Sequence, residues 1–222
     1  MNYFSEKDIR DLVCRIVAES RQMPEQQAAG DGDRVPVEIS GRHVHLDRRT
    51  AELLFGPGHE LTPKRELSQP GQFLAEERVK IVTPAGQLEN VAVLGPFRDR
   101  NQVELSLSDA NGLKLKPPVR LSGDLQGAAD VFLVGPKGAV MAQESVIIAK
   151  AHIHMTPADA RRYGVSDGEQ VSVCLDSGRS VTLNDVIIRV SEQYALAMHV
   201  DFDEANAAQI GRGMTGLLRK NR

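Results

Sequence analysis

The feature that most constrains this chain is a histidine motif that occurs twice. Residues 40–46 read Ser-Gly-Arg-His-Val-His-Leu, and residues 149–155 read Ala-Lys-Ala-His-Ile-His-Met. Each copy places two imidazoles at positions i and i+2 among β-branched residues, so in an extended strand both rings lie on one face. Two rings on one face can bind one metal ion. The sequence therefore predicts two related metal-binding strands.

The similarity continues beyond the histidines. A short helix with a start signal is predicted at residues 47–54 and again at 156–163, and each ends at a glycine, Gly56 or Gly164. Each copy then has two strands joined by a glycine turn, at residues 78–82 and 88–93 and at residues 170–175 and 180–188. With 19 glycines, 11 prolines and many short Val/Ile runs, the chain is predicted to be mainly β and internally duplicated.

The ends of the two copies supply a third ligand for each. Residues 104–111 align with residues 199–206 at a shared Asp/Glu-Ala-Asn ending, and Glu104 then falls where His199 stands. The two predicted ligand sets are His43, His45 and Glu104, and His152, His154 and His199. Three ligands with a fourth position left open are typical of catalytic metal sites. The alternative is that these histidines are structural and inherited through duplication, as we expect for His59, which lies outside the repeated frame.

Composition sets wider limits. The chain has 222 residues, 41% of them hydrophobic and 26% charged, enough for one large core or two small ones. A formal net charge of −3 gives no bias towards nucleic acid or anionic lipid, so neither is an expected partner. No stretch reaches the ~18 apolar residues of a membrane span, and no signal peptide is recognisable. We therefore expect a cytoplasmic protein.

The first 20 residues predict an amphipathic helix. Its apolar stripe consists of Ile9, Leu12, Val13, Ile16 and Val17. Residues 21–34 are rich in Pro, Gln, Ala, Gly and Asp and predict a flexible linker. The helix either packs on its own domain or binds another partner, and the linker favours the second interpretation.

Two other segments permit two interpretations each. Residues 61–72 are polar and contain Lys64 and Arg65, which suits a solvated loop or a basic rim for an anionic ligand. Arg98 follows a Gly-Pro turn six residues before Glu104. Its guanidinium is either a surface group or a bidentate phosphate ligand beside the metals.

The sequence resembles the PduL-type phosphate acyltransferases (phosphate propanoyltransferases) of bacterial microcompartments. The resemblance covers residue 35 to the C-terminus, and no predicted ligand position departs from it. The matching stretches are residues 40–46, 69–73, 93–98, 102–106, 150–157, 198–201 and 203–208.

The resemblance implies a fold of two small β-barrels capped by short helices, with the N-terminal amphipathic helix outside them. Residues 35–41 and 150–222 would form one barrel, and residues 42–149 the other. Two zinc ions would lie between the barrels.

The resemblance also implies a reaction, the reversible exchange of CoA for inorganic phosphate on a short acyl group. His43, His45 and Glu104 would hold a zinc whose open position can take the CoA sulfur, and His152, His154 and His199 would hold the second zinc. Arg98 would orient phosphate. CoA contacts are implied for Ser40, Arg65 and Asn206, and the N-terminal helix resembles peptides that carry cargo into microcompartment shells. A homodimer or larger oligomer, inside a microcompartment for propanediol degradation, is expected.

Three alternatives stay open. The acyl group is propanoyl or acetyl, because no residue in the sequence identifies chain length. A two-zinc hydrolase would use the same ligands but would need a base that activates water and no phosphate-binding arginine. A scaffold without activity would bind the shell through its N-terminal helix alone.

Overall fold

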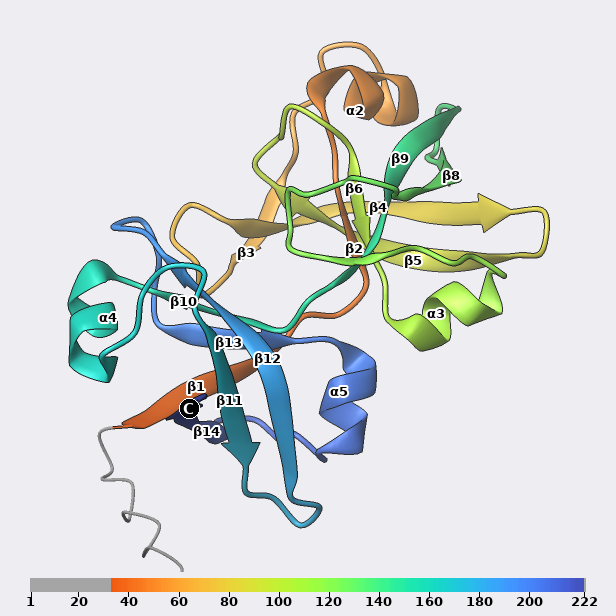
Figure 1. Ribbon diagram of the computed structural model, residues 1–222. Helices are drawn as coiled ribbons and strands as arrows, with labels where there is room; N and C mark the ends of the chain where they lie inside the picture. Colours follow the sequence, from red (N-terminus) through yellow and green to blue (C-terminus); the bar gives the residue numbers. More distant parts are fainter. Residues whose placement is uncertain (1–32, 222) are drawn as a thin grey trace, which may run out of the picture. The chain divides into compact units, whose positions relative to one another are not determined.

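The computed structural model describes residues 33–221 and is mainly β, with two closed six-stranded barrels (Figure 1). The predicted double-barrel fold is thereby confirmed. The predicted N-terminal helix lies outside the described residues. No helix among residues 33–221 is long and apolar enough to cross a membrane.

The first barrel, here called the His/Glu barrel, contains the first histidine pair. Its strands close in the order β4-β5-β2-β6-β9-β8, because β8 pairs with both β9 and β4. β3 extends this sheet beside β4, and β7 pairs with β9. The strands are β2 (His43–His45), β3 (Pro63–Glu66), β4 (Phe73–Thr83), β5 (Gly86–Gly95), β6 (Gln102–Glu104), β7 (Val119–Arg120), β8 (Ala129–Val134) and β9 (Ala139–Ala149).

The second barrel, here called the three-His barrel, contains the second pair. It closes in the order β1-β13-β10-β12-β11-β14. The strands are β1 (Arg34–Ile39), β10 (His152–Met155), β11 (Gln170–Leu175), β12 (Val181–Val190), β13 (Ala197–Val200) and β14 (Thr215–Lys220). The two barrels have the same pairing pattern, so β2 corresponds to β10, β5 to β12 and β6 to β13.

The two barrels exchange one strand each. β1 precedes β2 in the chain but pairs with β13 and β14 of the three-His barrel. β9 precedes β10 but pairs with β6 and β8 of the His/Glu barrel. In Figure 1, orange β1 accordingly lies among the blue strands. The chain therefore crosses between barrels immediately before each histidine pair, at residues 40–42 and 150–151.

Each barrel has its own apolar core, and the middle residue of each histidine motif belongs to it. Val44 packs in one cluster and Ile153 in the other, both fully buried. Burying such a side chain contributes ~1.5–3 kcal/mol. Because strand side chains alternate in direction, an inward Val44 or Ile153 sends its two flanking histidines to the opposite face.

The helices follow the predicted start and stop signals. Asp47 caps α2 (Arg48–Phe55), which ends at Gly56. Thr156 and Asp159 form a capping box for α4 (Pro157–Tyr163), which ends at left-handed Gly164 (φ 64°, ψ 35°). Both predicted helices are confirmed. Two further short helices, α3 (Leu107–Gly112) and α5 (Phe202–Ala207), begin just after β6 and β13.

Candidate functional site

Strand register brings each histidine pair next to its third predicted ligand. In the antiparallel β2–β6 pair, His43 lies opposite Glu104. In the corresponding β10–β13 pair, His152 lies opposite His199. Residues directly opposite have Cβ atoms about 4.5–5.5 Å apart. Glu104 and His199 therefore occupy the same register position in the two barrels, as the sequence alignment predicts.

The crossover segments fix the tautomer of the first histidine in each pair. His43 Nδ1 lies 2.8 Å from the carbonyl oxygen of Gly41, and His152 Nδ1 lies 2.8 Å from that of Lys150. A carbonyl oxygen only accepts, so Nδ1 must carry the proton and donate it. When either ring is neutral, its Nε2 keeps a lone pair for a metal or another acceptor role.

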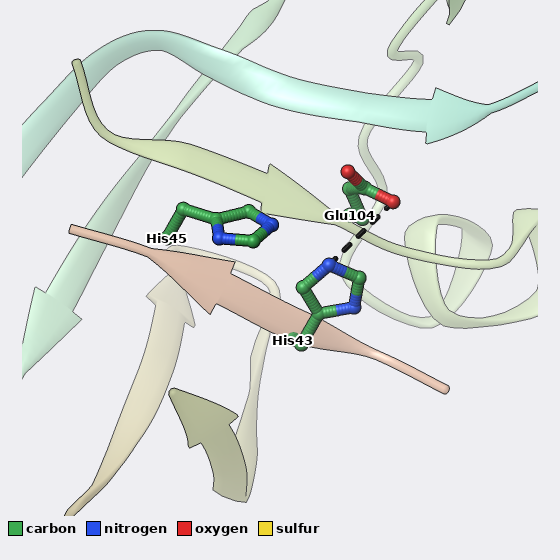
Figure 2. Close-up of side chains that lie close together, drawn as sticks. All are labelled: His43, His45 and Glu104. Atoms are coloured by element: carbon green, nitrogen blue, oxygen red, sulfur yellow. Dashed lines mark ion pairs between the residues drawn. The ribbon is translucent and has the colours of Figure 1, made fainter. Parts of the chain in front are cut away.

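The first ligand set converges on one point (Figure 2). His43 Nε2 lies 3.6 Å from Glu104 Oε2, and one ligand atom from each of His43, His45 and Glu104 lies within 4.8 Å of the others. Among residues 33–221, this is the one group of three His, Cys, Asp or Glu side chains that meets at such distances. All three side chains are buried.

These residues fit a zinc ion. Two imidazoles and a carboxylate form the donor set of an open, three-ligand site, in which ligand atoms lie about 3.3 Å apart. The buried Nδ1 atom of His45 has no hydrogen-bond partner. A buried polar atom without a partner costs free energy, and coordination would remove that cost.

The second ligand set is more loosely arranged. The ring centroids of His152, His154 and His199 lie 4.7, 5.1 and 5.3 Å apart, but their ligand atoms do not converge as those of the first set do. The Nδ1 atom of His154 is again buried and without a partner, as its counterpart in His45 is. The ring of Tyr194 packs 4.2 Å from that of His154.

Burial keeps four of the rings neutral. It lowers the pKa of His45 and His152, lowers that of His154 to about 2 and lowers that of His199 to about 4. Neighbouring histidines lower the pKa of His45, His154 and His199 further. These four rings therefore do not have to release a proton before they bind a metal at neutral pH.

His43 and Glu104 behave differently because they face each other. Burial alone would lower the pKa of His43 and raise that of Glu104. The attraction between them outweighs burial, so the pKa of His43 is raised and that of Glu104 falls well below its usual range. Glu104 is an anion throughout the neutral range.

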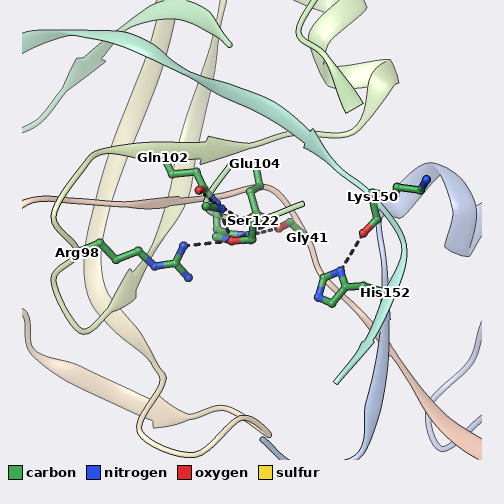
Figure 3. A network of polar contacts seen from close by, with 9 residues as sticks. Gly41, Arg98, Gln102, Glu104, Ser122, Lys150 and His152 are labelled. Atoms are coloured by element: carbon green, nitrogen blue, oxygen red, sulfur yellow. Dashed lines mark hydrogen bonds and ion pairs between the residues drawn. The ribbon is translucent and has the colours of Figure 1, made fainter. Parts of the chain in front are cut away.

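A polar network joins Arg98 to the first ligand set (Figure 3). Arg98 donates to Ser122 Oγ (3.1 Å). Gln102 Nε2 donates to the same oxygen (2.8 Å) and also to Glu104 Oε1 (2.6 Å). The N–H of Gly123 donates to Gln102 Oε1 (2.8 Å). Burial lowers the pKa of Arg98, although a guanidinium remains charged.

One cleft of about 990 Å³ brings the predicted site residues together from both barrels. Arg98 and Arg65 line this cleft, whereas Lys64 pairs with Glu76 (2.8 Å). Asn206 lies exposed on α5 and does not line it. The predicted site residues that line the cleft are Ser40, His43, His45, Arg65, Arg98, Glu104, His152, His154 and His199.

His59 has the structural role expected for it. Its Nε2 lies 2.8 Å from Glu77 Oε1, its ring packs 5.0 Å from that of Phe55, and it does not line the cleft. The hydrogen bond and the ring contact together explain this histidine without a metal.

The cleft residues to which the sequence assigned no role include Gln69, Arg189 and Tyr194. Arg189 interrupts an apolar run on β12, at the register position that Leu94 holds on β5. That exchange of an apolar residue for a cation between copies is a signal in the sequence. Gln69 and Tyr194 lie in loops outside the repeated pattern. Gln69 lies in one of the stretches that resemble the family, and Tyr194 lies in none of them.

The chain is similar to known proteins over most of its length. A model of the family described as phosphate propanoyltransferase matches residues 36–211. A phosphate propanoyltransferase of Thermotoga maritima is 54% identical over 178 residues, 80% of this chain and 85% of the relative. That of Listeria monocytogenes is 49% identical over 186 residues (84% and 87%), and that of Alkaliphilus metalliredigens is 45% identical over 214 residues (96% and 97%).

The comparisons define the class of protein as an acyltransferase. Within that class, the chain belongs to the phosphate propanoyltransferase family.

Proposed function

We propose that this chain exchanges CoA and inorganic phosphate on a propanoyl group, so that propanoyl-CoA and phosphate give propanoyl phosphate and CoA. The observation that carries the proposal is the single cleft into which both ligand sets and Arg98 project. Its relatives are named for this activity. The reaction breaks the carbon–sulfur bond of the thioester and forms a carbon–oxygen bond to phosphate. The sulfur leaves with the electron pair and takes up the proton that phosphate loses.

We propose two zinc ions per chain, one held by His43, His45 and Glu104 and one by His152, His154 and His199. When bound, the ions would supply Lewis acidity to the thioester and stabilise a thiolate. The neutral rings of the second set and the hydrogen bonds of Gly41 and Lys150 support these assignments.

The residues of the chain bind and orient the reactants. Arg98, held by Ser122, would present its guanidinium to the phosphate oxygens and place one of them for attack on the carbonyl carbon. Glu104 stays ionised and fixes His43. No side chain needs to act as a nucleophile, because phosphate itself is one.

Further proposals concern the CoA contacts, the N-terminal segment, the domain limits and the oligomeric state. Ser40, Arg65 and Asn206 would contact CoA, and the lining of the cleft by Ser40 and Arg65 supports the first two. Residues 1–20 would bind a microcompartment shell or its cargo, with residues 21–34 as a linker. The domain limits 35–41 with 150–222, and 42–149, and a homodimer or larger oligomer also stay predictions.

The test is turnover of propanoyl-CoA by the purified full chain, with and without phosphate. CoA release is followed as free thiol, and acyl phosphate as its hydroxamate. Release that requires phosphate and yields equal acyl phosphate is expected. Equal release without phosphate would instead indicate a hydrolase, and faster turnover of acetyl-CoA would show that the acyl group is acetyl.

A further inference from the structure

We propose that Arg189 is a second anion-binding residue of the cleft, which holds the phosphoryl group of phosphate or of the acyl phosphate together with Arg98. The inference rests on the proposed function and deepens it, since it adds a residue from the other barrel to the phosphate site.

The position of Arg189 follows from strand pairing. β12 runs parallel to β10, and the register places Arg189 beside His154. Its guanidinium carbon lies 5.9 Å from the centre of the Tyr194 ring, and that ring lies 4.2 Å from the ring of His154. Arg189 is half-buried and lines the same cleft as Arg98. Its cation is therefore held beside the second ligand set.

Neither Arg98 nor Arg189 forms an ion pair with a carboxylate within residues 33–221. By contrast, Arg42 pairs with Asp109 (3.2 Å) and Arg48 with Glu60. The side chain of Arg98 donates to the neutral hydroxyl of Ser122. Two half-buried cations without paired carboxylates favour an anion between or beside them.

The positive charge of Arg189 also acts on Arg98. Burial is the main reason that the pKa of Arg98 is lowered. The charge of Glu104 raises this pKa, and the positive charge of Arg189 lowers it. Like charges that face one cleft repel, and a bound dianion would remove that repulsion. This electrostatic effect supports the proposal that Arg98 and Arg189 bind one anion together.

Phosphate is the ligand whose chemistry fits such a pair. Its oxygens can accept bidentate bonds from two guanidinium groups at once. One group would come from each barrel, so phosphate would be held between the two ligand sets. The acyl phosphate carries the same group, so Arg189 would act on phosphate in one direction and on acyl phosphate in the other.

The experiment compares Arg189→Met, which keeps most of the packing on Tyr194, with Arg189→Lys, which keeps the charge. Arg179→Met is the matched control, because Arg179 is exposed and does not line the cleft. For Arg189→Met we expect the KM for phosphate to rise at least ~10-fold, with the KM for propanoyl-CoA within about twofold of the wild type. Arg189→Lys should recover part of the loss, and Arg179→Met should change neither constant.

A second measurement does not depend on turnover. Calorimetric titration of the metal-loaded protein with inorganic phosphate should show the same weakening in Arg189→Met, at unchanged metal content and melting temperature. A raised KM for propanoyl-CoA with normal phosphate binding would overturn the proposal and make Arg189 a contact to CoA. Unchanged constants would show that it only packs against Tyr194. A wild type that binds phosphate but transfers no acyl group would refute the proposed function alone.

Discussion

Gln69 and Ala195 are 126 residues apart, and they exchange two hydrogen bonds across the two barrels. Gln69 Nε2 donates to the carbonyl of Ala195 (3.0 Å), and the N–H of Ala195 donates to Gln69 Oε1 (3.2 Å). Gln69 is 4% exposed, and its Nε2 lies 3.5 Å from Nε2 of His199. One buried amide thus holds the loop that carries Tyr194 and lies against a predicted metal ligand.

We predict that Gln69→Ala loosens the second ligand set. The change leaves the N–H and C=O of Ala195 without these partners, at a cost on the order of 1–3 kcal/mol. Denaturant unfolding should show the loss of stability, and dialysis against a chelator should remove metal from the variant sooner than from the wild type. Gln143→Ala, at an exposed position on β9, is the control. Unchanged metal retention in Gln69→Ala would show that the amide does not position His199.

Metal content should be two zinc ions per chain, because each barrel supplies its own three ligands. His152→Ala should lose one ion and keep the other largely in place, since His43, His45 and Glu104 share no side chain with the second set. Elemental analysis of the purified proteins measures both. One ion or fewer in a fully active wild type would contradict the prediction.

Arg98→Ala should slow phosphate-dependent turnover at least ~10²-fold, because a charge-assisted contact to the reacting phosphate is lost. Arg98→Lys should restore little of the rate, since an ammonium group cannot form the same two parallel bonds. Zinc content should not change in either variant. Normal turnover in Arg98→Ala would mean that phosphate binds elsewhere.

The stability of the protein should depend on pH through Glu204. Burial raises the pKa of this carboxyl group to about 7, although it accepts a hydrogen bond from the N–H of Asp201. A raised pKa means that the stabilising contribution is present below pH ~4.5 and is lost as the pH rises through about 7. Glu204→Gln keeps an acceptor for Asp201 and removes the charge.

The free energy of unfolding of Glu204→Gln should therefore exceed that of the wild type by roughly 1–3 kcal/mol at pH 8 and by much less at pH 5. Denaturant titrations at the two pH values measure the difference. Glu192→Gln, at an exposed position, should show no such dependence. A pH-independent difference in Glu204→Gln would contradict the assignment.

Deletion of residues 1–20 should preserve metal content and catalysis and abolish capture by a microcompartment shell. The same deletion should give a smaller and more uniform oligomer, because the sequence predicts an apolar stripe there. Leu12→Glu with Ile16→Glu should reproduce these effects without shortening the chain. Size exclusion, activity and co-purification with shells measure them, and loss of metal or folding on deletion would show that the segment belongs to the core.

Local signals made part of this structure predictable. Asp47 and Thr156 are side chains that cap helices, and the two helices begin directly after them. The two-residue spacing of the histidines determines their common face, and the alignment of Glu104 with His199 reproduces the strand register. Such features depend on neighbours in the sequence, or on a repeat that can be aligned by eye.

Long-range features were not accessible in this way. An alternating strand pattern does not identify its partner strand, so the pairing of β1 with β13 came from family resemblance and not from periodicity. Helices α3 and α5 have six residues each, too few for a periodic signal. The contact of Gln69 with Ala195 joins two loops, and no pattern within either loop indicates the other.

The exchange of β1 and β9 has a consequence for the origin of the duplication. A fragment with only the first copy would contain β1, which has no place in its own barrel, and would lack β9, which closes that barrel. Val37 on β1 pairs with Met198 on β13, so β1 can pair only after most of the chain has been synthesised. β1 and β9 are counterparts in the two copies, so a chain with one copy could close a barrel with its own first strand or with that of a second molecule. If the strand is exchanged, as it is here, the smallest ancestor with this architecture would be a homodimer with two identical sites, and fusion of two copies would let the sites become different.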